Sequence, residues 1–249
     1  MRARKQIEIT ERDIKILEFV FEHRAVTFRQ LANRFFNGAS TPTVYVRLDK
    51  LRRSGLLKKS FVLWKAKRSV IFGITDKGLK QFADSYSYKI TKPDFKSDSV
   101  AHDLGLVMLR ERLEKTKMVV EYLSESMLQS CGQLVEHEKL GVFSRINSDA
   151  ALAIETTKNK FHVALEYEIS DKQESRYAKK LTEYYYSPNV AAVFYVCGDA
   201  SIEKLIRNVD VEVGQKWDAK VFTCLEETTH SATGSLPFVN RANAMFSLA

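Results

Sequence analysis

The first part of the fold is decided by the stretch Ala39–Lys77, which reads ASTPTVYVRLDKLRRSGLLKKSFVLWKAKRSVIFGITDK. Ser40 or Thr41 is placed to cap a helix, and Pro42 suits its first turn, where the missing N–H costs nothing. The apolar stripe of this helix recurs at helical spacing and consists of Val44, Leu48 and Leu51. A Ser-Gly pair ends the helix, and two strand-like runs, LLKKSFVLW and RSVIFGIT, follow as a hairpin joined by KAK.

Polar and cationic side chains occupy the other faces of this helix and the tip of the hairpin. On the helix they are Thr43, Tyr45, Arg47, Lys50 and Arg53, and at the tip they are Lys65, Lys67 and Arg68. This pattern is typical of a winged helix-turn-helix, whose helix enters the major groove of duplex DNA while the hairpin contacts the backbone or minor groove. The alternative is a helix pair used for protein contacts, whose basic residues only solvate the surface.

The formal charge of +8 is unevenly placed along the 249 residues. Residues 1–70 contain 17 Lys and Arg against 6 Asp and Glu, whereas the rest of the chain contains 22 against 25. A cationic excess confined to one end favours a polyanionic partner for that end and a near-neutral body behind it. Double-stranded DNA is therefore the partner that we expect.

Several features of the sequence indicate the cellular compartment of the protein. Its three cysteines, Cys131, Cys197 and Cys224, lie far apart without metal-ligand spacing, which fits a reducing cytoplasm better than a disulfide scaffold. No apolar run approaches the about 18–20 residues that a membrane span needs. The basic N-terminus is not followed by the apolar core of a signal peptide. We expect a cytoplasmic protein without membrane contact.

The pattern along the chain predicts an α+β protein with two domains. Residues 1–84 are expected to form the winged helix-turn-helix, 85–98 a polar linker, 99–227 a second domain, and 228–249 a tail without clear pattern. The predicted order in the second domain is helix, three strands, helix, strand, helix, strand, with an irregular segment between the first two strands. This order indicates layers of helices on a mixed sheet.

The strand predicted at HVALEYEIS carries the residues of greatest chemical interest. Its period of two places Glu166 and Glu168 on one face, about 7 Å apart, and pairing with the preceding strand brings Asp149 to the same place. A divalent ion such as Mg²⁺ or Mn²⁺ would relieve the repulsion among three carboxylates and activate water for phosphodiester hydrolysis. The alternatives are an ordinary half-exposed strand, or salt bridges from the cations that follow, Lys172, Arg176 and Lys180.

Four short motifs resemble the replication-relaxation family of plasmids and other mobile elements. They are AHDLGLVMLRERL (101–113), SDA (148–150), ALEYEIS (164–170) and RYAKKLTEYY (176–185), and the likeness covers most of residues 10–225. The second domain also resembles the PD-(D/E)xK nuclease fold, whose αβββαβ core has the same order of elements. In that superfamily an Asp, and a Glu-x-Lys on the next strand, hold a metal and activate water.

The nuclease resemblance implies a metal site and a catalytic set. Asp149 and Glu166 match the metal-binding positions and would hold Mg²⁺ or Mn²⁺. The third position of the motif is Glu168 instead of Lys, and Lys172 would have to reach back from the following helix to replace it. The resemblance therefore leaves open an active endonuclease and a nuclease-like domain without catalysis.

Three functions remain after these observations. The first is a DNA-binding protein acting in replication, relaxation or mobilisation of a plasmid or other mobile element, with replication or relaxosome proteins as partners. The second is a metal-dependent endonuclease targeted by its winged helix. The third is a transcriptional regulator whose second domain forms a homodimer or binds a partner protein. We prefer the first, because the evidence for DNA is stronger than the evidence for catalysis.

Overall fold

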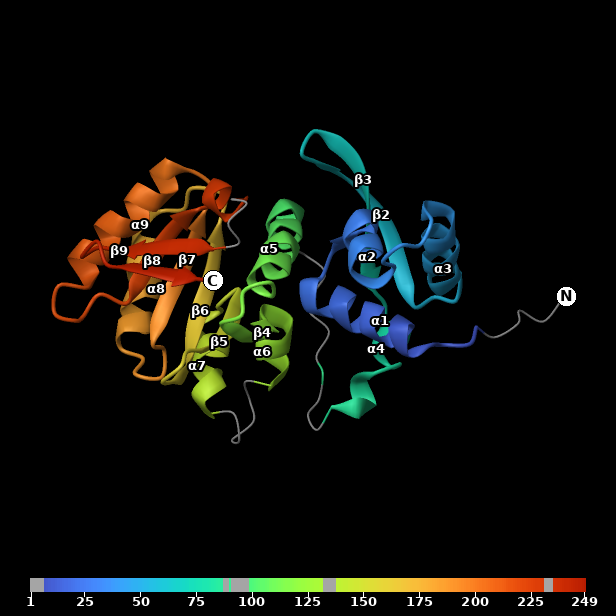
Figure 1. The fold of residues 1–249 in the computed structure, drawn as a ribbon, viewed down its shortest axis with the longest axis horizontal. Coiled ribbons are helices and arrows are strands. Elements are labelled where there is room, and N and C mark those ends of the chain that lie inside the picture. The colour runs from blue at the N-terminus through green and yellow to red at the C-terminus, as the bar shows by residue number, and fades with distance from the viewer. Residues whose placement is uncertain (1–6, 87–89, 91–98, 132–137, 231–234) are drawn as a thin grey trace, which may run out of the picture. The chain divides into compact units, whose positions relative to one another are not determined.

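The computed structural model describes residues 7–86, 90, 99–131, 138–230 and 235–249 (Figure 1). The chain divides into two compact units, Met1–Val107 and Met108–Ala249, and the division falls within helix α5 (Val100–Leu113). Most of the predicted linker, 87–89 and 91–98, lies outside the described residues. Within the described parts of the chain, none of the helices combines the length and the apolar character needed to span a bilayer.

The first four α-helices of the N-terminal unit each begin after a threonine or serine cap. The helices are α1 (Glu11–His23), α2 (Phe28–Phe35), α3 (Thr41–Arg53) and α4 (Asp76–Leu79), capped by Thr10, Thr27, Ser40 and Thr75. The first two caps form reciprocal capping boxes with Asp13 and Gln30, which satisfy backbone N–H groups that have no partner within the helix. The predicted cap of α3 is confirmed as Ser40, with proline in the first turn.

Three antiparallel strands complete this unit, in the order β1-β3-β2. They are β1 (Val26–Thr27), β2 (Leu57–Trp64) and β3 (Lys67–Ile74). Trp64 pairs with Lys67, so the turn of the β2–β3 hairpin consists of Lys65 and Ala66 alone, with φ of 48° and 58°. Positive φ at both turn residues matches the twist of the flanking strands. In Figure 1 the tip of the hairpin projects past α2 and α3.

Burial of the apolar stripe fixes the orientation of α3. Val44, Leu48 and Leu51 are at most 1% exposed, as the helical spacing predicts. Burying such a side chain stabilises the fold by roughly 1.5–3 kcal/mol. The remaining faces of α3 consequently point away from the core of the unit.

The C-terminal unit is built on a mixed sheet of seven strands in the order β10-β9-β8-β7-β6-β5-β4. The strands are β4 (Val119–Ser124), β5 (Ala150–Glu155), β6 (Lys160–Glu168), β7 (Ala192–Cys197), β8 (Val221–Leu225), β9 (Leu236–Asn240) and β10 (Met245–Leu248). Strands β6, β7 and β8 are parallel, and the other neighbours are antiparallel. Together the two units give the α+β class that the sequence predicts.

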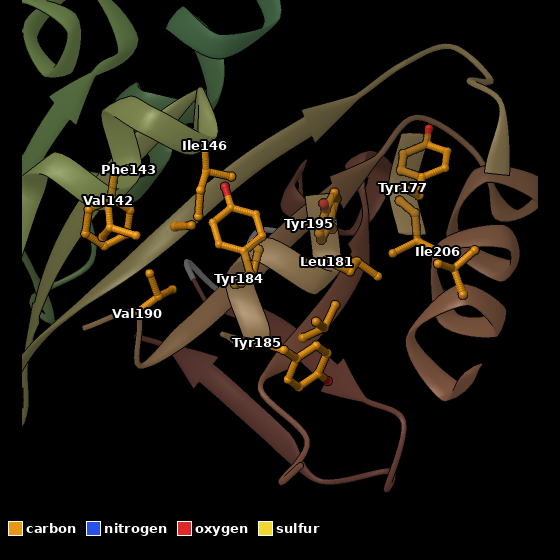
Figure 2. Close-up of a cluster of buried hydrophobic side chains, with 14 of the residues drawn as sticks. Val142, Phe143, Ile146, Tyr177, Leu181, Tyr184, Tyr185, Val190, Tyr195 and Ile206 are labelled. Atoms are coloured by element: carbon orange, nitrogen blue, oxygen red, sulfur yellow. The ribbon is translucent and has the colours of Figure 1, made fainter. Parts of the chain in front are cut away.

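Helices cover one face of this sheet and form a core with it. They include α7 (Glu138–Ile146), α8 (Glu174–Tyr185) and α9 (Ala200–Val213), and their buried side chains pack against inward residues of β5 to β8. Figure 2 shows Tyr177, Leu181 and Tyr184 of α8 gathered with Tyr195 of β7 in this cluster. Every residue of β7 is buried, as its continuous apolar run indicates.

Two sequence predictions for this unit are wrong. The segment expected to be irregular contains α6 (Glu125–Cys131) and α7, and the expected tail, 228–249, contains the end of a 3₁₀ turn (Glu226–His230) together with β9 and β10. Phe238 of β9 is fully buried, and its ring lies 4.5 Å from the ring of Phe194 in β7. The ring of Phe246 in β10 lies 5.5 Å from the same Phe194 ring. These strands are stabilised by aromatic packing against a distant part of the chain, which local periodicity does not reveal.

Candidate functional site

Helix α3 presents most of its predicted binding residues to solvent. Thr43, Tyr45, Lys50 and Arg53 are exposed, and the side chain of Arg53 is 74% accessible although it pairs with Asp49 at 2.6 Å. The exposed residues of α3 follow from the burial of its opposite face. The helix therefore offers a hydroxyl, a phenol and cations on one accessible surface.

Arg47 is placed differently from the prediction that it points outward. Its Nε donates to Asp13 Oδ1 at 2.9 Å, a terminal nitrogen pairs with the other Asp13 oxygen, and the same nitrogen donates to the Glu8 carbonyl at 2.9 Å. Burial alone would raise the pKa of Asp13, but hydrogen bonds from Arg47 and Thr10 outweigh it and hold the pKa below its ordinary value. Arg47 thus joins α3 to the start of α1, because Asp13 is fully buried and needs a cation.

The hairpin carries an unbalanced positive charge. The strands and turn from Leu57 to Ile74 contain five Lys or Arg and no Asp or Glu. The three residues predicted at its tip, Lys65, Lys67 and Arg68, are all exposed. No carboxylate of the described residues pairs with any of them.

Aromatic rings and cations alternate along one face from α3 to the hairpin, a feature that the sequence pattern did not predict. Lys59 Nζ lies 5.4 Å from the centre of the Tyr45 ring and 5.3 Å from that of Phe61, and the Arg68 guanidinium lies 4.4 Å from the Phe61 ring. Cations over aromatic faces are attracted by the ring quadrupole. The alternation of Lys59, Phe61 and Leu63 along β2 is the sequence signal that could have revealed this face.

Of the three carboxylates expected to converge in the C-terminal unit, Asp149 and Glu166 lie near each other. Glu166 and Glu168 occupy alternate positions on β6 and are 1% and 3% exposed. Ala150 pairs with Leu165, so continuing this antiparallel register sets Asp149 opposite Glu166. The Asp149 charge raises the pKa of Glu166, in agreement with this proximity.

Glu166 is held by side chains from α8. Lys180 Nζ lies 2.5 Å from Glu166 Oε2, and the Tyr184 hydroxyl donates to Oε1 while it contacts Ser148 Oγ at 2.7 Å. Lys180 also donates to the Asn147 carbonyl at 3.0 Å. Of the three cations that the sequence offers as salt-bridge partners for the carboxylates, Lys180 is the one that pairs with Glu166.

Burial sets the protonation behaviour of this network. Desolvation raises the pKa of Glu166 to about 7, although Lys180 and Tyr184 act in the opposite direction. Burial alone would lower the pKa of Lys180, but the carboxylates of Glu166 and Asp149 outweigh it and raise that pKa. Burial and the Glu166 charge raise the pKa of Tyr184 well above its ordinary value, so its hydroxyl remains a donor.

The other predicted catalytic residues are engaged separately. Lys172 lies just before α8, and its Nζ pairs with Glu168 Oε1 at 2.5 Å. Asp149 Oδ2 accepts a hydrogen bond from the Tyr167 backbone N–H at 2.7 Å. Lys172 therefore reaches back toward the strand, but to Glu168 and not to the pair formed by Asp149 and Glu166.

The donor set of this network does not fit the expected Mg²⁺ or Mn²⁺. Within the described ranges, no group of three or more His, Cys, Asp or Glu side chains is arranged to hold a metal ion. Both oxygens of Glu166 already have partners in Lys180 and Tyr184. A cation supplied by the protein balances the carboxylate that the resemblance assigned to a metal.

The fold and these two regions define a class of protein: a two-unit α+β chain with a cationic helix–hairpin surface and a buried network of carboxylate, lysine and tyrosine. The model of the replication-relaxation family matches residues 17–189, well over half of the chain. The protein therefore belongs to the replication-relaxation family. No curated protein and no solved structure gave a significant match.

Family membership agrees with the motifs recognised in the sequence and points to a role in the replication or relaxation of a plasmid or other mobile element. The structure adds that three of the motifs meet in space. Asp149 comes from SDA, Glu166 from ALEYEIS, and Lys180 and Tyr184 from RYAKKLTEYY. The residues of this network are thus contributed by the segments that carry the resemblance.

Proposed function

We propose that this replication-relaxation protein binds duplex DNA through the N-terminal unit, which acts as a winged helix-turn-helix. The observation that carries the proposal is the hairpin from Leu57 to Ile74, with five cations and no carboxylate, standing next to the exposed polar face of α3. A polyanion is the partner that such a surface attracts. Three helices followed by a projecting hairpin further support this assignment.

In this proposal α3 lies in the major groove and the hairpin follows the neighbouring backbone or minor groove. Thr43 and Tyr45, in the first half of α3, contact base edges, whereas Lys50 and Arg53 contact phosphates. Lys65, Lys67 and Arg68 extend the phosphate contacts along the duplex. Arg47 is not a direct contact in this arrangement, and instead holds α3 against α1.

Fluorescence anisotropy of a labelled duplex titrated with the full chain tests DNA binding. The wild type is expected to bind in dilute salt, and Lys50→Ala/Arg53→Ala to bind several-fold more weakly. The matched control is Lys179→Ala/Lys204→Ala, which removes the same charge from exposed positions of the C-terminal unit. No binding by the wild type, or an equal weakening in the control, would contradict the proposal.

We assign to the C-terminal unit a nuclease-like architecture that serves DNA contact or assembly with replication or relaxosome proteins or a second copy of the chain. The engagement of Glu166 by Lys180 and Tyr184 supports a role without metal-dependent cleavage. Covalently closed plasmid incubated with the protein and Mg²⁺ or Mn²⁺ is expected to stay closed. Nicking by the wild type that Glu166→Gln abolishes would establish the endonuclease instead.

A further inference from the structure

The two faces of the β2–β3 hairpin differ in what covers them. On one face, Val62 and Trp64 pack with Ala25, Ile71 and Leu104 of the same unit. On the other face, Phe61 is 53% exposed and Leu63 is 81% exposed. The first face anchors the hairpin to the body of the unit, so the second face is presented by a supported strand and not by a loose loop.

The exposed face combines a protruding apolar side chain with cations held in place. Arg68 stands opposite Leu63 in the strand register, and its guanidinium rests on the Phe61 ring. The Lys59 ammonium group lies near the Phe61 ring and also near the ring of Tyr45 in α3. The Phe61 ring therefore holds two cations in place, whereas the Leu63 side chain stays exposed to solvent.

We infer that Leu63 is an apolar wedge that enters the minor groove of the bound duplex and bends the DNA. The inference rests on the proposed DNA-binding function and specifies how the hairpin is used. Minor-groove proteins commonly insert Phe, Leu, Ile or Met between base steps, which partly unstacks them and kinks the duplex. Lys59 and Arg68 beside the wedge, together with Lys65 at the turn, contact the phosphates on either side.

The occupant of this face follows from its charge. An apolar protein surface would leave the surrounding cations unpaired, and an acidic protein surface would leave Leu63 against charged groups, whereas a DNA groove offers phosphates along its walls and apolar base faces between them. Burying Leu63 between base steps also removes a large exposed apolar side chain from water. Contacts between rings and cations run without a break from Tyr45 of α3 through Lys59 and Phe61 to Arg68 of the hairpin. This continuous surface allows α3 and the hairpin to contact one duplex together.

The test measures bending and affinity separately on the full chain. A mixed-sequence duplex of about 30 base pairs carries a donor and an acceptor fluorophore at its two ends, and protein is added to saturation. The wild type is expected to raise energy transfer by bringing the ends together. Leu63→Ala is expected to abolish that rise at saturation, while the salt dependence of binding stays unchanged because every cation is retained.

Two further variants control the experiment. Leu63→Phe keeps an insertable side chain and is expected to retain the bend, whereas Val211→Ala trims an exposed apolar residue of the C-terminal unit, 51% accessible, and is expected to behave as wild type. A thermal melt like that of the wild type verifies that Leu63→Ala folds. A saturated wild-type complex without bending, or unaltered bending by Leu63→Ala, overturns the wedge and leaves the proposed function standing. Absence of any DNA binding overturns both.

Discussion

The hairpin of the N-terminal unit and the carboxylate network of the C-terminal unit treat charge in opposite ways. The hairpin exposes Lys65, Lys67 and Arg68 with no carboxylate partner among the described residues. In the network, Glu166 and Glu168 are buried and each is paired with a lysine of the same unit. Exposed cations without carboxylate partners indicate that the hairpin binds an external anion. Buried carboxylates paired with lysines of the same unit indicate that those charges stabilise the fold.

The same contrast separates an arginine from a lysine on a single helix. Arg47 and Lys50 are both in α3, and the sequence pattern predicts that both face DNA. Arg47 instead neutralises the buried Asp13, while Lys50 remains exposed. Composition alone does not distinguish a cation that binds DNA from one that stabilises the fold, whereas substitution of each residue separates the two roles.

The largest effect is expected from breaking the buried pair. Lys180→Ala leaves the Glu166 carboxylate buried near Asp149 without its cation, so we expect the free energy of unfolding of the C-terminal unit to fall by about 3–5 kcal/mol at pH 8. Urea unfolding followed by Trp217 fluorescence, in a Trp64→Phe background, reports on this unit. The neighbouring exposed lysine supplies the control, because Lys179→Ala should change the unfolding midpoint very little.

The next largest effect is expected in the pH dependence of the unfolding free energy of the same unit. In the fold the pKa of Glu166 is raised from 4.5 to about 7, so the folded state binds more protons than the unfolded chain between these values. Stability therefore falls as pH rises through this window, by about 3 kcal/mol in all. The measurement is the difference in unfolding free energy between wild type and Glu166→Gln from pH 4.5 to 8. A constant difference would contradict the assignment.

Arg47→Ala is expected to destabilise the N-terminal unit by about 2 kcal/mol, because Asp13 would keep only its hydrogen bonds from Thr10. Trp64 fluorescence in a Trp217→Phe background follows the unfolding of this unit. Lys50→Ala should leave the same transition unchanged. Equal effects of the two substitutions would erase the distinction between structural and binding cations on α3.

Local patterns in the sequence predicted the features that depend on neighbouring residues. The cap at Ser40, the stripe Val44–Leu51, the basic hairpin and the shared face of Glu166 and Glu168 all arise from short spacing rules. The pairing of Asp13 with Arg47 joins residues 34 positions apart, and no local period encodes it. Local periodicity does not predict the strands β9 and β10 for the same reason, since the burial of Phe238 and the partial burial of Phe246 depend on the distant ring of Phe194.

The central claim, that the exposed cations of the hairpin hold duplex DNA, is tested most directly by the salt dependence of binding. The full chain is titrated onto a labelled duplex at several salt concentrations, as wild type, as Lys65→Ala/Lys67→Ala/Arg68→Ala, and as the charge-matched control Lys179→Ala/Lys204→Ala/Lys216→Ala. In the hairpin variant, the slope of log K against log salt should become shallower by about 0.9 for each phosphate that is no longer neutralised. In the control, the slope should stay at the wild-type value. A hairpin variant with the wild-type slope would contradict the account.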